Sequence, residues 1–164
     1  MLFLIPFVLV GAFFVYLAIN TALIATGVGR TVVEVSKARL APGESVDLHV
    51  SQSGKMDLNR LTVTLVCEEM ATYTVGTNSR TARKKVFELV ASGRSSVSVR
   101  PGSPVEMCKT VKIPDDAMHS FKARHNQIHW RFEVKGDVAR WPDFDRFFPI
   151  LVEPRAPVKT KNTR

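Results

Sequence analysis

The first 29 residues of the chain contain no Asp, Glu, Lys or Arg, although the sequence of 164 residues has 23 basic and 15 acidic side chains. About 20 apolar helical residues cross the hydrocarbon core of a bilayer, and a helix over residues 2–27 would be about 39 Å long. Pro6 lies near its start, where a missing N–H costs little, and Gly27 and Gly29 suit its end. The pattern predicts a transmembrane helix and its exit in residues 1–29.

Two other interpretations of this segment exist. A cleaved signal peptide has a basic start, a shorter apolar stretch and an A-x-A cleavage site, and residues 1–29 show none of these features. A buried helix of a soluble domain is the remaining alternative. The transmembrane helix is the interpretation that the residues favour.

The flank that follows this segment predicts its orientation. Arg30, Lys37 and Arg39 lie just after it, and basic residues accumulate on the cytoplasmic side of a membrane span. We therefore expect a single-pass membrane protein whose C-terminal domain is cytoplasmic. That domain would occupy residues 30–154, and residues 155–164 would form a basic, disordered tail.

Beyond Arg30 the apolar residues alternate with polar ones, and turn residues separate the alternating runs. Alternation of this kind is typical of antiparallel strands with one buried face, and two such sheets bury those faces against each other. The sequence predicts an all-β, antiparallel β-sandwich of about nine strands after the helix. The candidate strands are residues 31–37, 46–50, 61–67, 72–75, 85–90, 96–100, 105–113, 128–134 and 147–152.

The cysteines and tryptophans constrain the subtype and the core. An immunoglobulin domain places a Trp between its two Cys, whereas Trp130 and Trp141 both follow Cys108, which disfavours that subtype. Cys67 shares a face with the alternating apolar residues of its strand, so we expect a buried thiol. A Cys67–Cys108 disulfide would require the domain to lie outside the cytoplasm. Trp130 is expected in the core.

Residue patterns that carry chemistry are missing. His125 and His129 have the spacing of a helical zinc pair, but no Glu follows the first His, and on a strand they would lie about 13 Å apart. Asp115 and Asp116 follow Pro114 and are expected in a solvated turn. The sequence lacks Gly-x-Ser-x-Gly and a phosphate-binding loop. We expect no enzyme activity, cofactor, metal or small-molecule substrate.

One basic run forms the candidate interaction surface. Arg80, Arg83, Lys84 and Lys85 lie in or beside a predicted loop at residues 76–79. Such a run is ordinarily a solvated hairpin, but it could also face lipid head groups or an acidic protein. Nucleic acid is not expected as a partner, because the charge is dispersed and no stacking aromatics are interleaved with it.

Several short motifs resemble the arrestin-type β-sandwich. They are the apolar–Pro step Ile113-Pro114, the element His119-Ser120-Phe121, and the aromatic-containing alternation of residues 126–134. Residues 61–68 resemble the strand that precedes the long variable hairpin of those domains. One departure is Met118-His119-Ser120, where the arrestin pattern often has Pro before Ser.

Two further motifs, Trp141-Pro142-Asp143-Phe144 and Phe148-Pro149-Ile150, are similar to the tail of bacterial membrane proteins of unknown function. In those proteins a transmembrane helix precedes an arrestin-like domain. The resemblance covers about residues 31–154. It implies a non-catalytic scaffold that binds proteins through loops and exposed strands, and it transfers no site residue to this chain.

Four functions follow as hypotheses, in decreasing order of support. The first is a membrane-anchored scaffold or protein-interaction module at the cytoplasmic face, with its partner bound at the rim around residues 76–85 or at an edge strand. The second is a cell-envelope assembly domain of opposite topology, and the third is an accessory subunit of a larger membrane complex. An enzyme is the fourth, because the sequence offers no nucleophile with a nearby base.

Overall fold

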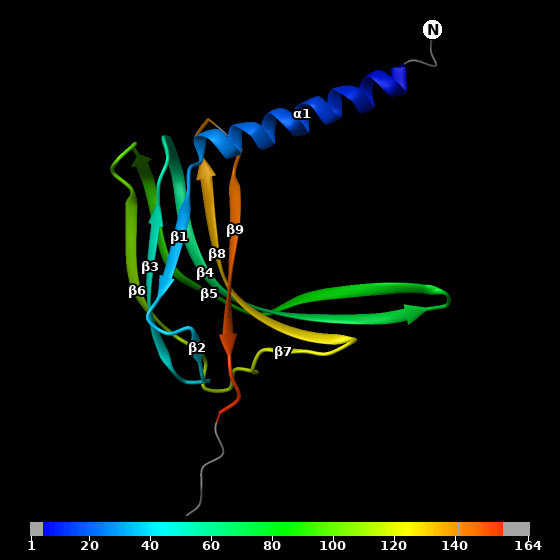
Figure 1. The fold of residues 1–164 in the computed structure, drawn as a ribbon, viewed down its shortest axis with the longest axis vertical. Helices are drawn as coiled ribbons and strands as arrows, with labels where there is room; N and C mark the ends of the chain where they lie inside the picture. Colours follow the sequence, from blue (N-terminus) through cyan, green and yellow to red (C-terminus); the bar gives the residue numbers. More distant parts are fainter. Residues whose placement is uncertain (1–4, 141, 156–164) are drawn as a thin grey trace, which may run out of the picture.

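The computed structural model describes residues 5–140 and 142–155, and within them the chain forms one helix followed by nine strands (Figure 1). The elements are α1 Ile5–Gly27, β1 Thr31–Val35, β2 Arg39–Leu40, β3 Ser45–Gln52, β4 Met56–Val75, β5 Asn78–Val99, β6 Val105–Lys112, β7 Phe121–Lys122, β8 Asn126–Val138 and β9 Phe144–Val152. The all-β class predicted for the chain after Arg30 is confirmed.

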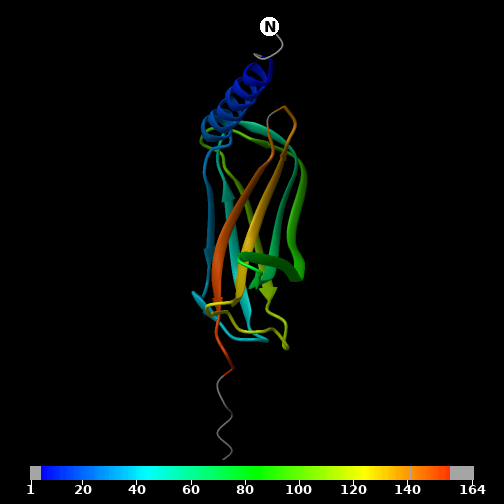
Figure 2. The same cartoon turned by 90° about the vertical axis from the view of Figure 1, so that its right-hand side faces the viewer.

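The strands form two facing sheets. The smaller sheet has the order β1-β3-β6, and the larger has the order β2-β9-β8-β4-β5 with β7 beside β8. Figure 2 shows that most strands of both sheets run along the long axis of the domain. All pairs are antiparallel except β2 with β9, where Arg39 pairs with Leu151 in parallel. The predicted antiparallel sandwich is confirmed, and this short pair is the one parallel pairing among the described strands.

The core lies between the two sheets and contains the inward residues that the alternation predicted. On β8, Trp130 and Phe132 are buried whereas Lys135 is exposed. The indole N–H of Trp130 donates to the Met118 carbonyl at 2.8 Å, so its polar atom is satisfied. Cys67 is buried as expected, and it and Cys108 are both free thiols.

Two strands are much longer than the alternation indicated. Residues 61–67 and 72–75, predicted as separate strands, belong to β4, and residues 85–90 and 96–100 fall almost entirely within β5. These strands have 20 and 22 residues. They pair from Met56–Val99 at one end to Val75–Asn78 at the other. The prediction missed their continuity because the apolar alternation stops where the pair leaves the core.

Over Ile5–Ala22, helix α1 exposes mainly apolar side chains. Ile5–Ala22 is long and apolar enough to cross a membrane, and none of this stretch is buried against the rest of the protein. A helix with this composition near the N-terminus is compatible with a membrane anchor or a signal sequence. Residues 1–4 lie outside the described residues. Of the predicted tail at residues 155–164, only Arg155 is described, and it donates to the Pro42 carbonyl.

Candidate functional site: a basic hairpin arm

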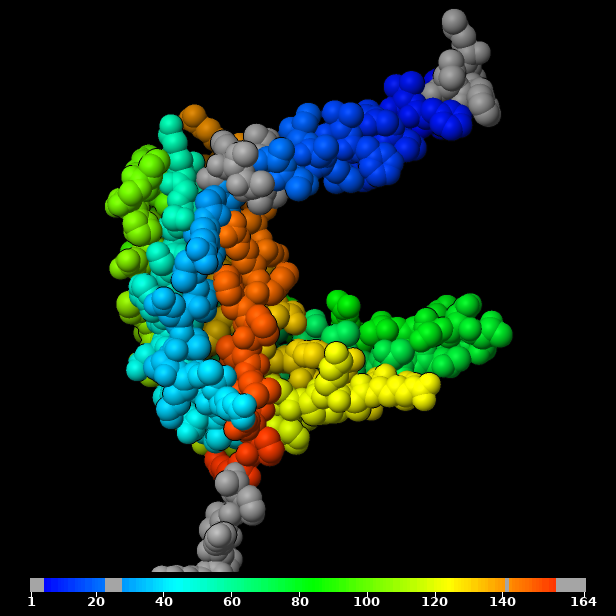
Figure 3. All heavy atoms as spheres, viewed as in Figure 1, coloured from blue at the N-terminus to red at the C-terminus, as the bar shows by residue number. Residues whose placement is uncertain are grey.

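A long hairpin leaves the sandwich and forms its most prominent projection. We call residues 68–85 the hairpin arm; Figures 1 and 3 show it extending away from the body of the two sheets. Each of its strands contributes eight residues, or about 26 Å at a rise of 3.3 Å per residue. At the tip, Gly76 has a φ of 64°. A glycine with positive φ at the first central position is what a two-residue type II′ hairpin turn uses.

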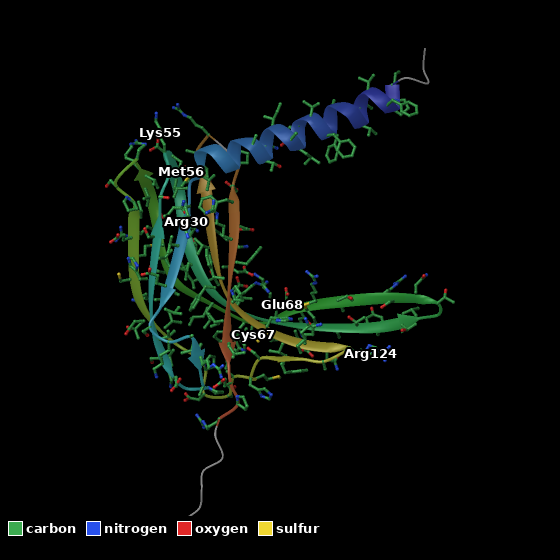
Figure 4. All side chains as sticks on the ribbon, in the orientation of Figure 1. Arg30, Lys55, Met56, Cys67, Glu68 and Arg124 are labelled. Atoms are coloured by element: carbon green, nitrogen blue, oxygen red, sulfur yellow. The ribbon has the colours of Figure 1, made fainter. Side chains whose placement is uncertain are left out.

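The arm leaves the sandwich where the buried alternation of β4 ends. Cys67 is buried in the core, and the next two residues, Glu68 and Glu69, are charged. The pairing of β4 with β5 shifts by one residue at this point, so that Val86 is left as a bulge opposite the Cys67–Glu68 step. Bulges bend a strand pair and increase its twist. Figure 4 labels Cys67 and Glu68 at this root of the arm.

A network of ion pairs fixes the root of the arm to the larger sheet. The Glu133 side chain is 2% exposed. Its Oε2 lies 3.0 Å from Lys85 Nζ, and its Oε1 lies 2.7 Å from Arg131 Nη2. Arg131 also reaches Glu68, with Nη1 at 3.1 Å from Oε2. The guanidinium of Arg131 lies 5.3 Å from the ring centre of Phe147. Lys85 and Glu68 belong to the arm, so the network joins both arm strands to β8.

The electrostatics of this network favour the charged forms. Burial acts to raise the pKa of Glu133, but the hydrogen bonds from Lys85 and Arg131 hold that pKa below its ordinary value. The hydrogen bond from Arg131 likewise lowers the pKa of Glu68. Burial disfavours the charged form of Lys85, and Glu133 outweighs it, so the pKa of Lys85 is raised. A buried carboxylate with two cationic donors is the arrangement that makes such burial tolerable.

The four residues of the basic run, which the sequence places in or beside a loop, lie in β5, directly after the turn at Gly76 and Thr77. Lys85 pairs with Glu68 across the strands and shares its face, which is the face of the network. Side chains alternate along a strand, so Arg83 lies on this same face, and Arg80 and Lys84 lie on the opposite one. The basic run therefore presents charge on both faces of the arm.

The end of α1 is tied to the sandwich by the residues that follow it. Val28 is fully buried, and its carbonyl accepts a hydrogen bond from Gln52 Nε2 at 2.8 Å. The Gly29 carbonyl accepts from Arg146 Nη2 at 2.6 Å. The sandwich therefore begins at Val28, before the boundary at residue 30 that the charge pattern predicts.

Arg30 completes this connection. Its backbone N–H donates to the Ser53 hydroxyl at 3.0 Å, and its carbonyl accepts from the Ser53 backbone at 2.9 Å. Figure 4 labels Arg30, which lies between the end of α1 and the start of β1. The helix thus joins the domain without a flexible linker between Val28 and β1.

The outer face of the smaller sheet carries a second group of polar residues. His49 lies between Glu34, at 3.4 Å from its Nδ1, and Glu106, at 3.8 Å from its Nε2. In the sheet register His49 also pairs with Cys108, and Glu34, His49 and Cys108 are among the residues that line a shallow hollow of about 760 Å³. Within residues 5–140 and 142–155, no group of three His, Cys, Asp or Glu side chains could hold a metal ion.

The other sequence candidates do not converge on a site. His129, on β8, makes a hydrogen bond with Gln127, and His125 lies just before that strand. Asp115 is exposed and pairs with Lys112 at 2.7 Å, as expected for a solvated turn. Its pKa is lowered by that hydrogen bond.

Sequence reasoning missed the groups that position the arm and the helix. Arg131 and Glu133 alternate with apolar residues in the sequence, which predicts that they point outward. Their partner Lys85 is far away in the sequence, so the pairing could not be inferred. Gln52 follows the alternating run of β3 on its inward face. A Gln at an inward position of a strand is the signal that could have indicated a buried hydrogen bond to the backbone.

Comparisons with known proteins define the fold. No protein-family model and no curated protein matches this chain. Among solved structures, the chain is similar to the crystal structure of Spo0M, a sporulation control protein from Bacillus subtilis, with a TM-score of 0.59 and 16% sequence identity. The match covers 77% of this chain, and the chain spans only half of the length of that structure. The likeness shows the fold, which is an arrestin-like β-sandwich.

Proposed function

We propose that this protein is a membrane-anchored, non-catalytic interaction module that presents an arrestin-like β-sandwich at the cytoplasmic face of a membrane. In this proposal α1 is the anchor and the hairpin arm is the element that meets a partner. The arrestin-like fold shared with Spo0M, a sporulation control protein, supports a regulatory or interaction role.

The connection between α1 and the sandwich is the observation that carries this proposal. An apolar helix with 0% burial in its candidate span needs a lipid environment or a partner. Val28 in the core and the bonds to Gln52, Arg146 and Ser53 attach that helix directly to the folded domain. A helix that was removed as a signal sequence would not require such a tie.

The projecting arm supports an interaction role. Its strands extend beyond the core, so the packing of the sandwich does not require them, and the Glu133 network holds their root in place. Confinement to a membrane raises the effective concentration of such a module for partners in the same membrane. The basic residues after the span, Arg30, Lys37 and Arg39, support the cytoplasmic orientation.

Membrane fractionation tests the anchor. We expect the full chain to stay in the membrane pellet after extraction at alkaline pH, and a chain that begins at Val28 to appear in the soluble fraction. Intact mass spectrometry of the membrane-bound protein should show that the helix is retained. A shorter mature chain that had lost the helix would identify a signal sequence and overturn the anchor.

A reporter fused after residue 164 tests the orientation. A reporter that is active only in the cytoplasm should be active in this fusion. Activity only of a reporter that works outside the cytoplasm would instead favour the cell-envelope assembly domain, with the same fold and opposite topology.

A further inference from the structure

We propose that the open edge of β5, over residues 79–90, binds an acidic extended segment of another protein as an added β-strand. This inference rests on the proposed role as an interaction module and names the class of partner. The partner segment would carry Asp or Glu opposite residues 80–84 and apolar, β-prone residues opposite residues 86–90.

The edge is open along the arm. β5 is the last strand of the larger sheet, and among the described parts of the chain it pairs only with β4 along this stretch. The backbone N–H of Thr72 donates to the His125 carbonyl at 2.6 Å, on the side of β4 away from β5. Thr72 pairs with Thr81, and in such an antiparallel pair both residues turn their backbone groups away from each other. The N–H and carbonyl of Thr81 therefore face the open side.

The positions of the basic side chains along this edge favour an added strand as the partner over a planar membrane surface. Arg80, Arg83 and Lys84 are exposed and form no salt bridge with any residue in the described ranges. They lie on alternate faces of the arm, so a planar bilayer could contact only one set at a time. An added strand also directs its side chains alternately to both faces, and its carboxylates could meet both sets.

Apolar side chains continue the edge toward the sandwich. Val86, Leu89 and Val90 are 42%, 42% and 62% exposed. Exposed apolar residues along an unpaired strand are the side-chain sites that strand addition uses for specificity. A second copy of the chain, paired antiparallel through the same basic residues, would bring like charges together, which is destabilising. The charge pattern thus favours a different, acidic protein.

The test uses the full chain in nanodiscs of zwitterionic lipid and two capped, fluorescent peptides of about twelve residues, enough to cover this edge. One peptide is rich in Val and Thr in its first half and in Glu in its second half, which suits antiparallel addition. The control peptide has Lys in place of each Glu. Fluorescence anisotropy measures binding, and hydrogen exchange measures the protection of individual backbone amides.

We expect the Glu peptide to bind, the Lys peptide not to bind, and the affinity for the Glu peptide to fall with added salt. Replacing Arg80, Arg83 and Lys84 together with Gln should weaken binding about tenfold. The same replacement at Lys55, Lys109 and Arg140, which are exposed elsewhere, should leave it unchanged.

A backbone variant separates strand addition from simple charge attraction. Thr81→Pro removes an N–H that faces the open side and should abolish binding, because proline cannot donate to an added strand. Thr81→Val keeps this N–H, loses the same hydroxyl and should bind like the original protein. Urea unfolding of both variants shows whether the fold is retained. Slower exchange of the Thr81 and Arg83 amides on binding would support the proposal directly.

Several results would overturn the proposal. Equal binding of the Glu and Lys peptides, or of the two Thr81 variants, would show that the edge does not accept a strand. Binding to vesicles containing phosphatidylserine, without binding to the Glu peptide, would identify a lipid surface. Aggregation of the triple Gln variant without any peptide binding would show that the basic residues only protect an open edge. None of these results depends on the anchor, which the fractionation experiment tests separately.

Discussion

Glu133 is buried on the outer face of the larger sheet, where it forms ion pairs with Lys85 and Arg131. A carboxylate removed from water costs several kcal/mol unless ion pairs and hydrogen bonds compensate, and Lys85 and Arg131 both contact this one. Arg131 is held in turn by Glu68 and by the ring of Phe147. At the scale of single residues, this network decides how the arm is attached.

Replacing Glu133 with Gln should therefore lower the free energy of unfolding by about 1–3 kcal/mol, because Arg131, which is 18% exposed, and Lys85, which is 36% exposed, lose the carboxylate that they share. The midpoint of urea denaturation measures this change. Asp145→Asn is the control. Asp145 is half-exposed and forms a long ion pair of 3.8 Å with Lys135, so this substitution should lower the free energy of unfolding by less than about 1 kcal/mol. Equal effects of the two substitutions would show that the network is not a structural tie.

The stabilisation from Glu133 should depend on pH. Its pKa is lower in the folded protein than in the unfolded chain, so its contribution is complete above the unfolded value and is lost as pH falls through the folded value. The lowered pKa of Glu68 acts in the same direction. The stability difference between the original protein and Glu133→Gln should thus be constant near pH 7 and shrink below about pH 4. A difference that grew on acidification would contradict this assignment.

Strand β8 shows how one element serves both the core and the arm. Its inward residues Trp130 and Phe132 fill the space between the sheets, while Arg131 and Glu133 lie outward in the ion-pair network. Its first residues continue beside β4 beyond the sandwich, where Ala71 pairs with Asn126. The strand therefore couples the stability of the core to the position of the arm.

Trp130→Ala should lower the free energy of unfolding by about 3–5 kcal/mol, because it removes a large buried side chain that packs on Phe87. Denaturant unfolding measures this loss. Trp130→Phe should cost less, since it keeps an aromatic ring but loses the hydrogen bond to Met118. An unchanged midpoint for Trp130→Ala would mean that this side chain is exposed.

The basic residues of β5 should differ in their contribution to stability. Replacing Arg80, Arg83 and Lys84 with Gln should change the free energy of unfolding by less than about 0.5 kcal/mol, since they are exposed. Adding Lys85→Gln should cost a further 1–2 kcal/mol or so, because Glu133 then loses a donor. Thermal or urea unfolding of the two variants provides the comparison. Equal stability of the triple and quadruple variants would show that Lys85, like the other three basic residues, does not contribute to stability.

At the scale of the whole molecule, direct contacts attach both the apolar helix and the projecting arm to the sandwich. Figure 3 shows the helix and the arm both projecting from the body of the sandwich. A truncated chain without the helix should keep an intact sandwich only if it retains Val28, which packs in the core. The soluble domain is therefore expected to begin at Val28 and not at Arg30.

A chain that begins at Val28 should be soluble and should give a far-UV spectrum dominated by β-structure. A chain that begins at Arg30 should be less stable by about 1.5–3 kcal/mol, because it loses a fully buried valine side chain. Circular dichroism and urea unfolding of the two truncated chains test both statements. A helix-dominated spectrum, or equal stability of the two chains, would contradict this account of the boundary.

The sequence alone determined the features that depend on local pattern. The uncharged start predicted an apolar helix, and the period-two alternation predicted the sandwich and the burial of Cys67 and Trp130. Both follow because burial against lipid or against a second sheet imposes a repeat that can be recognised in the residues.

Only the tertiary structure decided where the basic residues point and what holds them. Lys85 meets Glu133 through a pairing of distant segments, and the bulge at Val86 breaks the alternation where β5 leaves the core. Outside the core no buried face imposes a pattern on the sequence, so the residue alternation did not predict the length or the open edge of the arm, and only the resemblance of residues 61–68 pointed to a long hairpin. Strand pairing and ion pairs between segments far apart in the chain determined them.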